Sequence, residues 1–152
     1  MNYHNITHED MLNGDGLRVV LWVAGCNHNC KGCHNPETHD VNGGIPFDDA
    51  AKQDIFEYLN KDYTAGITFS GGDPLHPNNR ETITKLAKEI KGTTHKNIWL
   101  YTGYIYEQIK DLEIMNYIDV LVEGPFILEL KDDNLEWRGS CNQRIIELTK
   151  RK

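Results

Sequence analysis

Short apolar runs recur along the chain and are separated by more polar stretches. The first, LRVVLWV at residues 17–23, is almost continuously apolar and rich in β-branched residues, which predicts a buried strand. Similar short runs follow at residues 66–70, 97–102 and 118–124. The pattern therefore predicts four strands spread along most of the chain.

Two of the intervening segments have the periodicity of amphipathic helices. In residues 47–60, Ala51, Ile55 and Leu59 are spaced four positions apart, and acidic residues occupy the first turn, where they favour the helix dipole. Residues 78–92 also gather their apolar side chains on one face, and this pattern ends at a glycine. The residues concerned are Ile83, Leu86, Ala87, Ile90 and the terminal Gly92.

Strands that alternate with helices are typical of a mainly parallel α/β sheet with right-handed crossovers. The chain has 152 residues, whereas a complete eight-stranded β/α barrel usually takes about 250. We therefore expect an α/β fold that is an incomplete (partial) β/α barrel with a mainly parallel sheet. Because no repeat or low-complexity linker interrupts the pattern, residues 1–152 are expected to form a single domain.

Composition narrows the classes of function. The N-terminus lacks the features of a secretory signal, and no run of apolar residues is long enough to span a membrane, so we expect a cytoplasmic protein that does not bind membranes. The formal net charge of -7 argues against nonspecific binding to nucleic acid, whose phosphates require a basic surface.

Two unusual loops follow the first two predicted strands. The segment AGCNHNCKGCHNPETHD, residues 24–40, follows the first, and SGGDPLHP, residues 70–77, includes the end of the second. Ligands of parallel α/β proteins collect where the carboxyl ends of the strands converge. We therefore expect both loops to contribute to one active site.

The first loop contains Cys26, Cys30 and Cys33 in the spacing C-x3-C-x2-C. In a reducing compartment, cysteines this close together favour a metal-binding or catalytic role over disulfides. A structural zinc site needs four ligands, so it would have to recruit a fourth from His28, His34 or Cys141. If the three cysteines alone hold a [4Fe-4S] cluster, one iron lacks a protein ligand and is open to substrate.

The second loop suggests what could bind at an open iron. Gly71 and Gly72 permit close approach of backbone to a ligand, and Asp73 adds an acceptor that suits an ammonium group. Gly-Gly-Asp-Pro is also ordinary turn chemistry. Beside the cysteine triad on the same rim, a ligand that carries an amino group is the better interpretation.

These two motifs together resemble those of the radical S-adenosylmethionine enzymes. A more extensive resemblance is to the small activating proteins of the anaerobic, class III ribonucleoside-triphosphate reductases. It rests on segments from nearly the whole chain: MNYHNI, NGDGLR, CKGCHNPET, SGGDPLHP, WLYTGY, VLVEGPF and WRGSCNQR. Two positions depart from the usual pattern, since Gly32 stands where the wider superfamily often has an aromatic residue, and Cys141 stands where the activating proteins usually have serine.

The resemblance implies an oxidoreductase with two cofactors, a [4Fe-4S] cluster on the cysteine triad and S-adenosyl-L-methionine. Gly71, Gly72 and Asp73 would hold the amino group of S-adenosylmethionine, and the backbone around Gly32, Cys33 and His34 would contact its adenine. A one-electron donor such as a flavodoxin would reduce the cluster. The radical formed by cleavage would take a hydrogen atom from a glycine of the reductase large subunit.

Other residues allow a structural and a functional interpretation. Tyr101 could contact a cofactor or fill the core, and Thr102 with Gly103 could contact a cofactor or form the turn that enters a helix. Trp137 and Arg138 have the composition of an interface hot spot, although a clamp for the tail is equally consistent. Two other functions stay open: a radical enzyme that acts on a small molecule, and an iron-sulfur or zinc module without catalysis.

Overall fold

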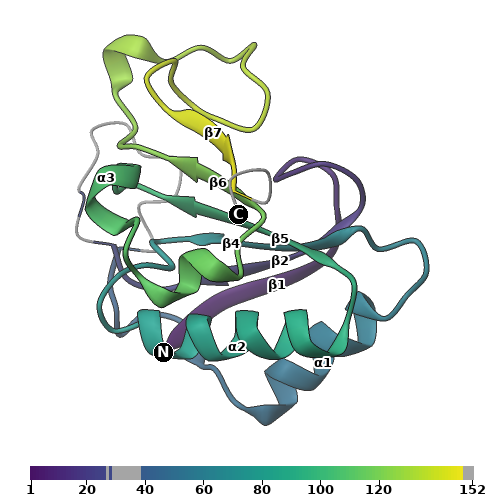
Figure 1. Cartoon of the computed structure of the whole chain (residues 1–152). Helices are drawn as coiled ribbons and strands as arrows, with labels where there is room; N and C mark the ends of the chain where they lie inside the picture. The colour runs from purple at the N-terminus through teal and green to yellow at the C-terminus, as the bar shows by residue number, and fades with distance from the viewer. Residues whose placement is uncertain (27, 29–38, 149–152) are drawn as a thin grey trace.

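The computed structural model describes residues 1–26, 28 and 39–148, and its centre is a seven-stranded sheet (Figure 1). The strands are β1 (Asn2–Asp10), β2 (Arg18–Val23), β3 (Ile45–Pro46), β4 (Gly66–Gly71), β5 (Asn97–Thr102), β6 (Val120–Glu123) and β7 (Arg144–Glu147). The helices are α1 (Asp49–Leu59), α2 (Arg80–Thr93) and α3 (Tyr106–Ile109), with short 3-10 helices η2 (Glu113–Asn116) and η3 (Leu128–Leu130).

The strands are ordered β3-β1-β2-β4-β5-β6-β7 across the sheet. The central strands β2, β4, β5 and β6 are parallel, which confirms the predicted α/β class and its mainly parallel sheet. The strands β1, β3 and β7 are antiparallel to their neighbours. Among the described residues the sheet is mixed and open, with β3 and β7 at its edges, and a partial barrel stays a prediction.

The four predicted strands and two predicted helices are all present. Residues 97–102 coincide with β5, and the other predicted boundaries differ from the observed ones by no more than two residues. The apolar positions predicted for the two helices are the buried residues of α1 and α2. The sequence did not predict β1, β3 or β7.

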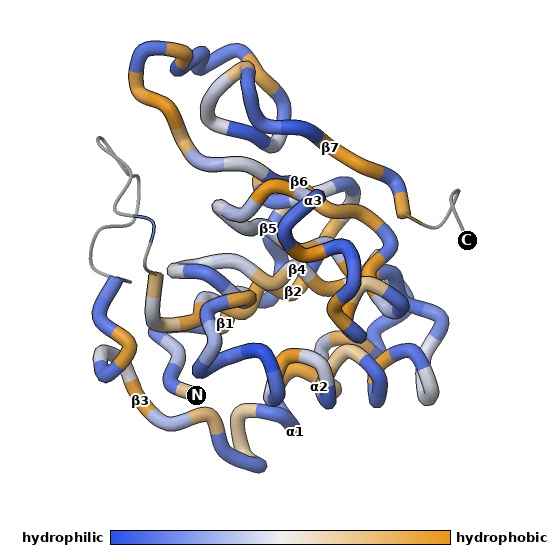
Figure 2. Tube along the Cα trace, turned by 60° about the vertical axis from the view of Figure 1, so that its left-hand side comes forward, coloured by the Kyte–Doolittle hydropathy of each residue, from blue (hydrophilic) through white to orange (hydrophobic). Residues whose placement is uncertain are grey.

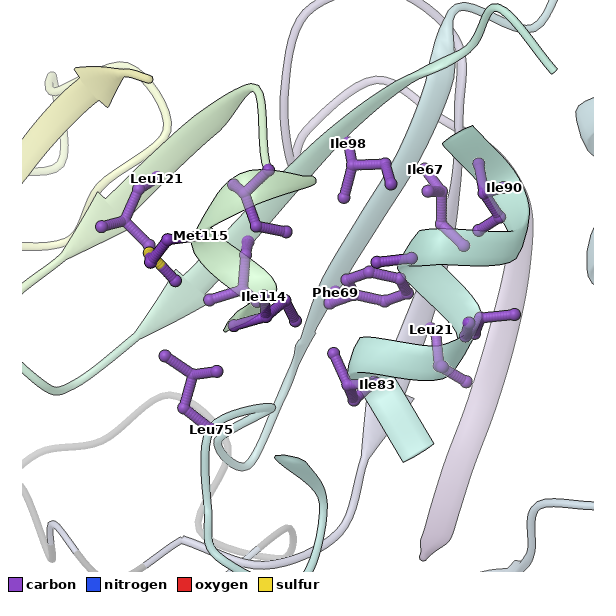
Figure 3. Close-up of a cluster of buried hydrophobic side chains, with 14 of the residues drawn as sticks. Leu21, Ile67, Phe69, Leu75, Ile83, Ile90, Ile98, Ile114, Met115 and Leu121 are labelled. Carbon is purple, nitrogen blue, oxygen red and sulfur yellow. The ribbon is translucent and has the colours of Figure 1, made fainter. Parts of the chain in front are cut away.

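One face of the sheet packs against α1 and α2 and forms the hydrophobic core. Leu21, Phe69, Leu100 and Leu121 lie in register on neighbouring parallel strands and are fully buried. Figure 3 shows Ile83 and Ile90 of α2 close to this row. Along both helices, hydrophobic positions alternate with hydrophilic ones (Figure 2), as expected for helices that bury a single face.

Loops cover the other face of the sheet. The loop between β1 and β2 lies over Arg18 and Trp99, and Gly14 approaches them so closely that a Cβ there would lie 2.8 Å from Cδ of Arg18. From the far end of the chain, Trp137 packs edge-on against Trp99 with ring centroids 4.8 Å apart. No helix of the described residues is long and apolar enough to cross a membrane.

Candidate active site at the carboxyl edge of the sheet

The loops that follow β2 and β4 are joined directly by backbone hydrogen bonds. The N–H of Gly72 donates to the carbonyl of Val23 at 2.8 Å, and the N–H of Asp73 donates to the carbonyl of Gly25 at 2.7 Å. The residue after Gly25 is Cys26, the first cysteine of the triad. The structure therefore brings the start of the cysteine loop and the glycine loop together at one edge of the sheet, as the sequence predicted.

Gly71 is required at its position because of the neighbouring strand. Its φ of 103° lies in the left-handed region that favours glycine. A Cβ at this position would lie 2.5 Å from the backbone nitrogen of Val23 and 2.6 Å from its carbonyl oxygen. The close approach that this glycine permits in the structure is thus to β2, and it allows the two loops to leave the sheet side by side.

Asp73 is buried, with only 1% of its surface exposed, and both of its carboxylate oxygens accept hydrogen bonds. Oδ1 accepts from the N–H of Leu75 at 2.8 Å, Oδ2 accepts from the N–H of Gly103 at 2.9 Å, and the hydroxyl of Thr102 lies 2.9 Å from both. The carboxylate therefore joins the loops that follow β4 and β5. Thr102 and Gly103, for which the sequence left two interpretations, contact Asp73.

His28 provides a further partner of Asp73 from within the cysteine loop. Its Nε2 lies 2.5 Å from Oδ2 of Asp73. The imidazole also packs edge-on against the ring of Tyr104, with centroids 4.6 Å apart. This contact could not be predicted from the sequence, because His28 and Asp73 are 45 positions apart.

Asn79 is a second site residue that the sequence did not reveal. It is fully buried, and its side-chain amide donates to the carbonyl oxygens of Ala24 and Asp73, at 2.9 and 3.1 Å. Its place directly before α2 is typical of a helix cap, yet its side chain makes no capping hydrogen bond. Instead, it holds the strand end that leads to the cysteines against the glycine loop.

Only one member of the cysteine triad lies within the described residues. Cys26 is half-buried at the carboxyl end of β2, and its N–H donates to the carbonyl of His39 at 3.1 Å, which closes the base of the loop. Cys30 and Cys33, with Gly32 and His34, lie outside the described residues. Cys141 is exposed in the segment between η3 and β7. The described residues contain no group of three or more metal-binding side chains.

A groove of about 670 Å³ runs along the face of the sheet that α1 and α2 leave uncovered. Trp22, Ser70 and Tyr101 form its floor, and the next residues along β2 and β4 are Val23 and Gly71. The groove therefore reaches the edge where the two loops meet. The residues that complete its lining come from the β1–β2 loop and from the segment before β7: Leu12, Asn13, Phe126, Asp132, Asp133, Leu135, Trp137, Arg138, Gly139 and Gln143.

Two polar atoms among the groove residues are buried without a hydrogen-bond partner in the described part of the chain. They are the hydroxyl of Tyr101 and Nε of Arg138. Burial raises the pKa of Tyr101 well above its usual value, so this hydroxyl keeps its proton at neutral pH.

Trp137 anchors the segment that forms one wall of the groove. It is the one non-glycine residue of the described chain with a positive φ, 62°. Its ring packs on Trp99, and Nη1 of the adjacent Arg138 donates to the carbonyl of Gln143 at 2.7 Å. These contacts support the interpretation of Trp137 and Arg138 as a clamp for the tail. A role of the pair in partner binding stays a prediction.

Comparison with known proteins gives a consistent result over almost the whole chain. Residues 12–146 match a family model described as a 4Fe-4S single cluster domain. The chain is 44% identical to the anaerobic ribonucleoside-triphosphate reductase-activating protein of Enterobacteria phage T4, over 95% of this chain and 93% of the phage protein. It is 43% identical to the protein of the same name from Escherichia coli K12, over 97% and 99% of the two chains. The Haemophilus influenzae relative, which carries the same name, is 42% identical over 95% and 97%.

Proposed function

Because this chain belongs to the family of anaerobic ribonucleoside-triphosphate reductase-activating proteins, we propose that it generates a glycyl radical on the large subunit of that reductase. It would do so by reductive cleavage of S-adenosylmethionine at a [4Fe-4S] cluster. The observation that carries the proposal is the position of Cys26 beside the Gly71-Gly72-Asp73 loop, joined through Gly25 and Val23.

Cys26, Cys30 and Cys33 are the proposed cluster ligands. The donor set fits, because thiolates from closely spaced cysteines are the usual ligands of iron-sulfur clusters. Cys26 is half-buried just beyond the end of β2, and its backbone N–H donates to the carbonyl of His39. Three ligands leave one iron for S-adenosylmethionine.

The cofactors supply the radical chemistry when they are bound: one electron breaks the sulfonium carbon-sulfur bond to give methionine and a 5'-deoxyadenosyl radical, which takes a hydrogen atom from glycine. The protein binds, orients and shields these groups. We propose that the amino group of S-adenosylmethionine lies beside the loop of Gly71, Gly72 and Asp73. Since the Asp73 carboxylate already has several donors, the backbone carbonyls of the two glycines are the proposed acceptors. The backbone at Gly32, Cys33 and His34 is proposed to contact adenine.

The groove beside the site is the proposed path for the reductase segment that carries the glycine. It reaches Ser70, the residue before Gly71, so a chain lying in it would come next to the cofactor site. A partner seated there would also exclude water from the radical, which is a recognised role of active-site closure. Glycine suits the task because no side chain blocks access to its α-hydrogen.

The test is anaerobic reconstitution with iron and sulfide, followed by reaction with S-adenosylmethionine and a one-electron donor such as a reduced flavodoxin. Addition of the reductase large subunit should yield 5'-deoxyadenosine together with a glycyl-radical doublet in the electron paramagnetic resonance spectrum. A large subunit whose radical glycine is replaced by alanine should give no doublet. If a small molecule is consumed in step with 5'-deoxyadenosine and the reductase gains no radical, the proposal is wrong.

A further inference from the structure

The imidazole of His28 occupies a fitted slot between the loops that follow β4 and β5. The carboxylate of Asp73 lies at one end of the slot, 2.5 Å from Nε2. Gly103 lies against the ring, and a Cβ there would be only 2.6 Å from Cδ2 of His28 and 2.7 Å from Cγ. Tyr104 supplies a second wall by its edge-on contact. The slot has room for the imidazole only because residue 103 has no side chain.

The acceptor at the end of the slot is held rigidly. Asp73 is fixed by Leu75 and Gly103 through backbone N–H groups and by the Thr102 hydroxyl. Nε2 of His28 shares a hydrogen bond with Oδ2, the same oxygen that accepts from the N–H of Gly103. The bond therefore links the imidazole to a carboxylate that two other loop segments already hold in place. The ring is therefore bonded to an acceptor that belongs to the loop after β4 and not to the cysteine loop.

The outer wall of the slot is braced in the same way. The guanidinium of Arg80, at the start of α2, lies 5.5 Å from the centroid of the Tyr104 ring. Nε of Arg80 also donates to the carbonyl of Leu75 at 2.6 Å. Thus α2 and the loops after β4 and β5 all contribute to the surroundings of one imidazole, although none of them belongs to the cysteine loop.

We propose that His28 is a positioning residue that fixes the cysteine loop for cluster binding. The backbone bond from Cys26 to His39 closes the base of the loop, and the bond from His28 to Asp73 attaches it at a second point, between the first two cysteines. Two attachments restrict the loop more than one does, so the thiolates lose less conformational freedom when they bind iron. This inference rests on the proposed function in that the triad holds the cluster.

The test compares His28→Ala with His28→Gln, whose side-chain amide can also donate to Asp73. Each protein is reconstituted, and loss of the cluster to an iron chelator is followed by absorbance. His28→Ala should lose the cluster roughly 10-fold faster than the unchanged protein, the lower end of the effect of removing a partner that orients metal ligands. His28→Gln should recover much of this difference. His95→Ala, at an exposed histidine outside the site, should behave as the unchanged protein does.

Gly103→Ala gives a second and independent approach, because it retains the imidazole and fills its slot. Cluster loss should accelerate here as well. In the double variant His28→Ala/Gly103→Ala the added methyl group meets no ring, so the cluster should be lost no faster than in His28→Ala alone. Thermal unfolding of each cluster-free protein checks that the variants remain folded.

Equal rates of cluster loss in the unchanged protein, His28→Ala and His28→Gln would overturn the inference. So would a Gln variant as labile as the Ala variant. Tighter binding of S-adenosylmethionine by His28→Ala, with cluster loss unchanged, would show instead that His28 competes with the cofactor. Failure of the unchanged protein to assemble a cluster would refute the proposed function itself, so the two failures are distinguishable.

Discussion

The buried polar residues at the carboxyl edge of the sheet are connectors between loops. Asp73 joins the loops after β4 and β5 and also the cysteine loop, and Asn79 joins the end of β2 to the glycine loop. A buried polar group is costly unless its hydrogen bonds are satisfied, so each connector requires its partners to stay in place. The site is therefore held by a few side chains whose loss should be felt in stability as well as in activity.

Asp73→Ala should destabilise the cluster-free protein. The change leaves the N–H groups of Leu75 and Gly103 without their acceptor, and a buried donor without a partner costs about 1 to 3 kcal/mol. We expect the free energy of unfolding in urea to fall by at least about 2 kcal/mol. Asp62→Ala, at an exposed aspartate after α1, should change it by less than about 0.5 kcal/mol. Equal effects of the two changes would show that the Asp73 contacts contribute little.

Three of the four cysteines are proposed cluster ligands, and Cys141 is not. Cys26→Ala, Cys30→Ala and Cys33→Ala should each abolish cleavage of S-adenosylmethionine, because the cluster would lose one of its three protein ligands. Cys141→Ser should retain about four iron atoms and full cleavage activity, since Cys141 is exposed in the segment before β7. Iron and sulfide analysis with a 5'-deoxyadenosine assay checks both. Loss of the cluster in Cys141→Ser would favour a closed site with four ligands.

Among the secondary-structure elements, β4 and α2 each contain a glycine whose replacement by alanine should change the free energy of unfolding, in opposite directions. Gly71 ends β4 with a positive φ and lies against the backbone of Val23, so Gly71→Ala should lower the free energy of unfolding by about 1 to 3 kcal/mol. Gly92 lies in α2, and a Cβ there would meet nothing within 4 Å. Gly92→Ala should therefore raise the free energy of unfolding by about 0.5 to 1 kcal/mol.

Urea denaturation of both variants measures this difference in sign. Gly71→Ala should also disturb the proposed site, since it pushes the glycine loop away from the strand that leads to Cys26. Gly92→Ala should leave cofactor cleavage unchanged. Similar stability changes for the two variants would contradict the role assigned to the close contact between β4 and β2.

The parts of the fold that the sequence predicted are those with strong apolar periodicity. The strands β2, β4 and β5 are buried over most of their length, and α1 and α2 each bury one face, so their patterns are clear. By contrast, none of the nine residues of β1 is buried, and its polar sequence shows no alternation. The strand forms because it pairs with β2 on one side and β3 on the other. Its formation therefore depends on residues outside its own sequence.

The same distinction applies to the site. The sequence placed the cysteine and glycine loops at one edge, because the ends of parallel strands must converge there. It could not predict that His28 would contact Asp73, or that the Asn79 amide would bond to the end of β2 and not cap α2. Both contacts depend on packing between distant loops. The proposed acceptor for the cofactor's amino group consequently moves from the Asp73 carboxylate to the neighbouring backbone.

At the scale of the whole molecule, the two faces of the sheet have different roles. The face under α1 and α2 forms the hydrophobic core. The opposite face holds Arg18, which is fully buried, donates to a hydroxyl and to backbone carbonyls, and lies 5.4 Å from the centre of the Trp99 ring. Burial lowers its pKa to about 10, which still leaves it charged at neutral pH. Arg18 and the Trp99–Trp137 contact support the loops whose other sides form the groove.

The rim of this groove carries an apolar side chain that is not packed into the core. Leu12 is 81% exposed, while its backbone N–H is held by Asp10 at 2.8 Å. The preceding Met11 is 68% exposed, and neighbouring exposed apolar side chains are typical of interaction sites. If the reductase segment enters here, Leu12→Glu should weaken its docking, because it replaces an apolar contact on the rim of the groove with a charge that loses its hydration on binding. The cluster and the cleavage of S-adenosylmethionine without the reductase should be unaffected.

We expect Leu12→Glu to reduce the yield of glycyl radical about 10-fold at limiting reductase, which corresponds to a loss of about 1.4 kcal/mol in binding. The matched control is Ile45→Glu, because Ile45 is 56% exposed on the edge strand β3 and does not line the groove. Electron paramagnetic resonance measures the radical, and excess reductase should restore it in Leu12→Glu, since the defect is in affinity. An equal loss of radical in both variants would indicate a general effect of added charge. No loss of radical in either would place the docking surface away from this rim.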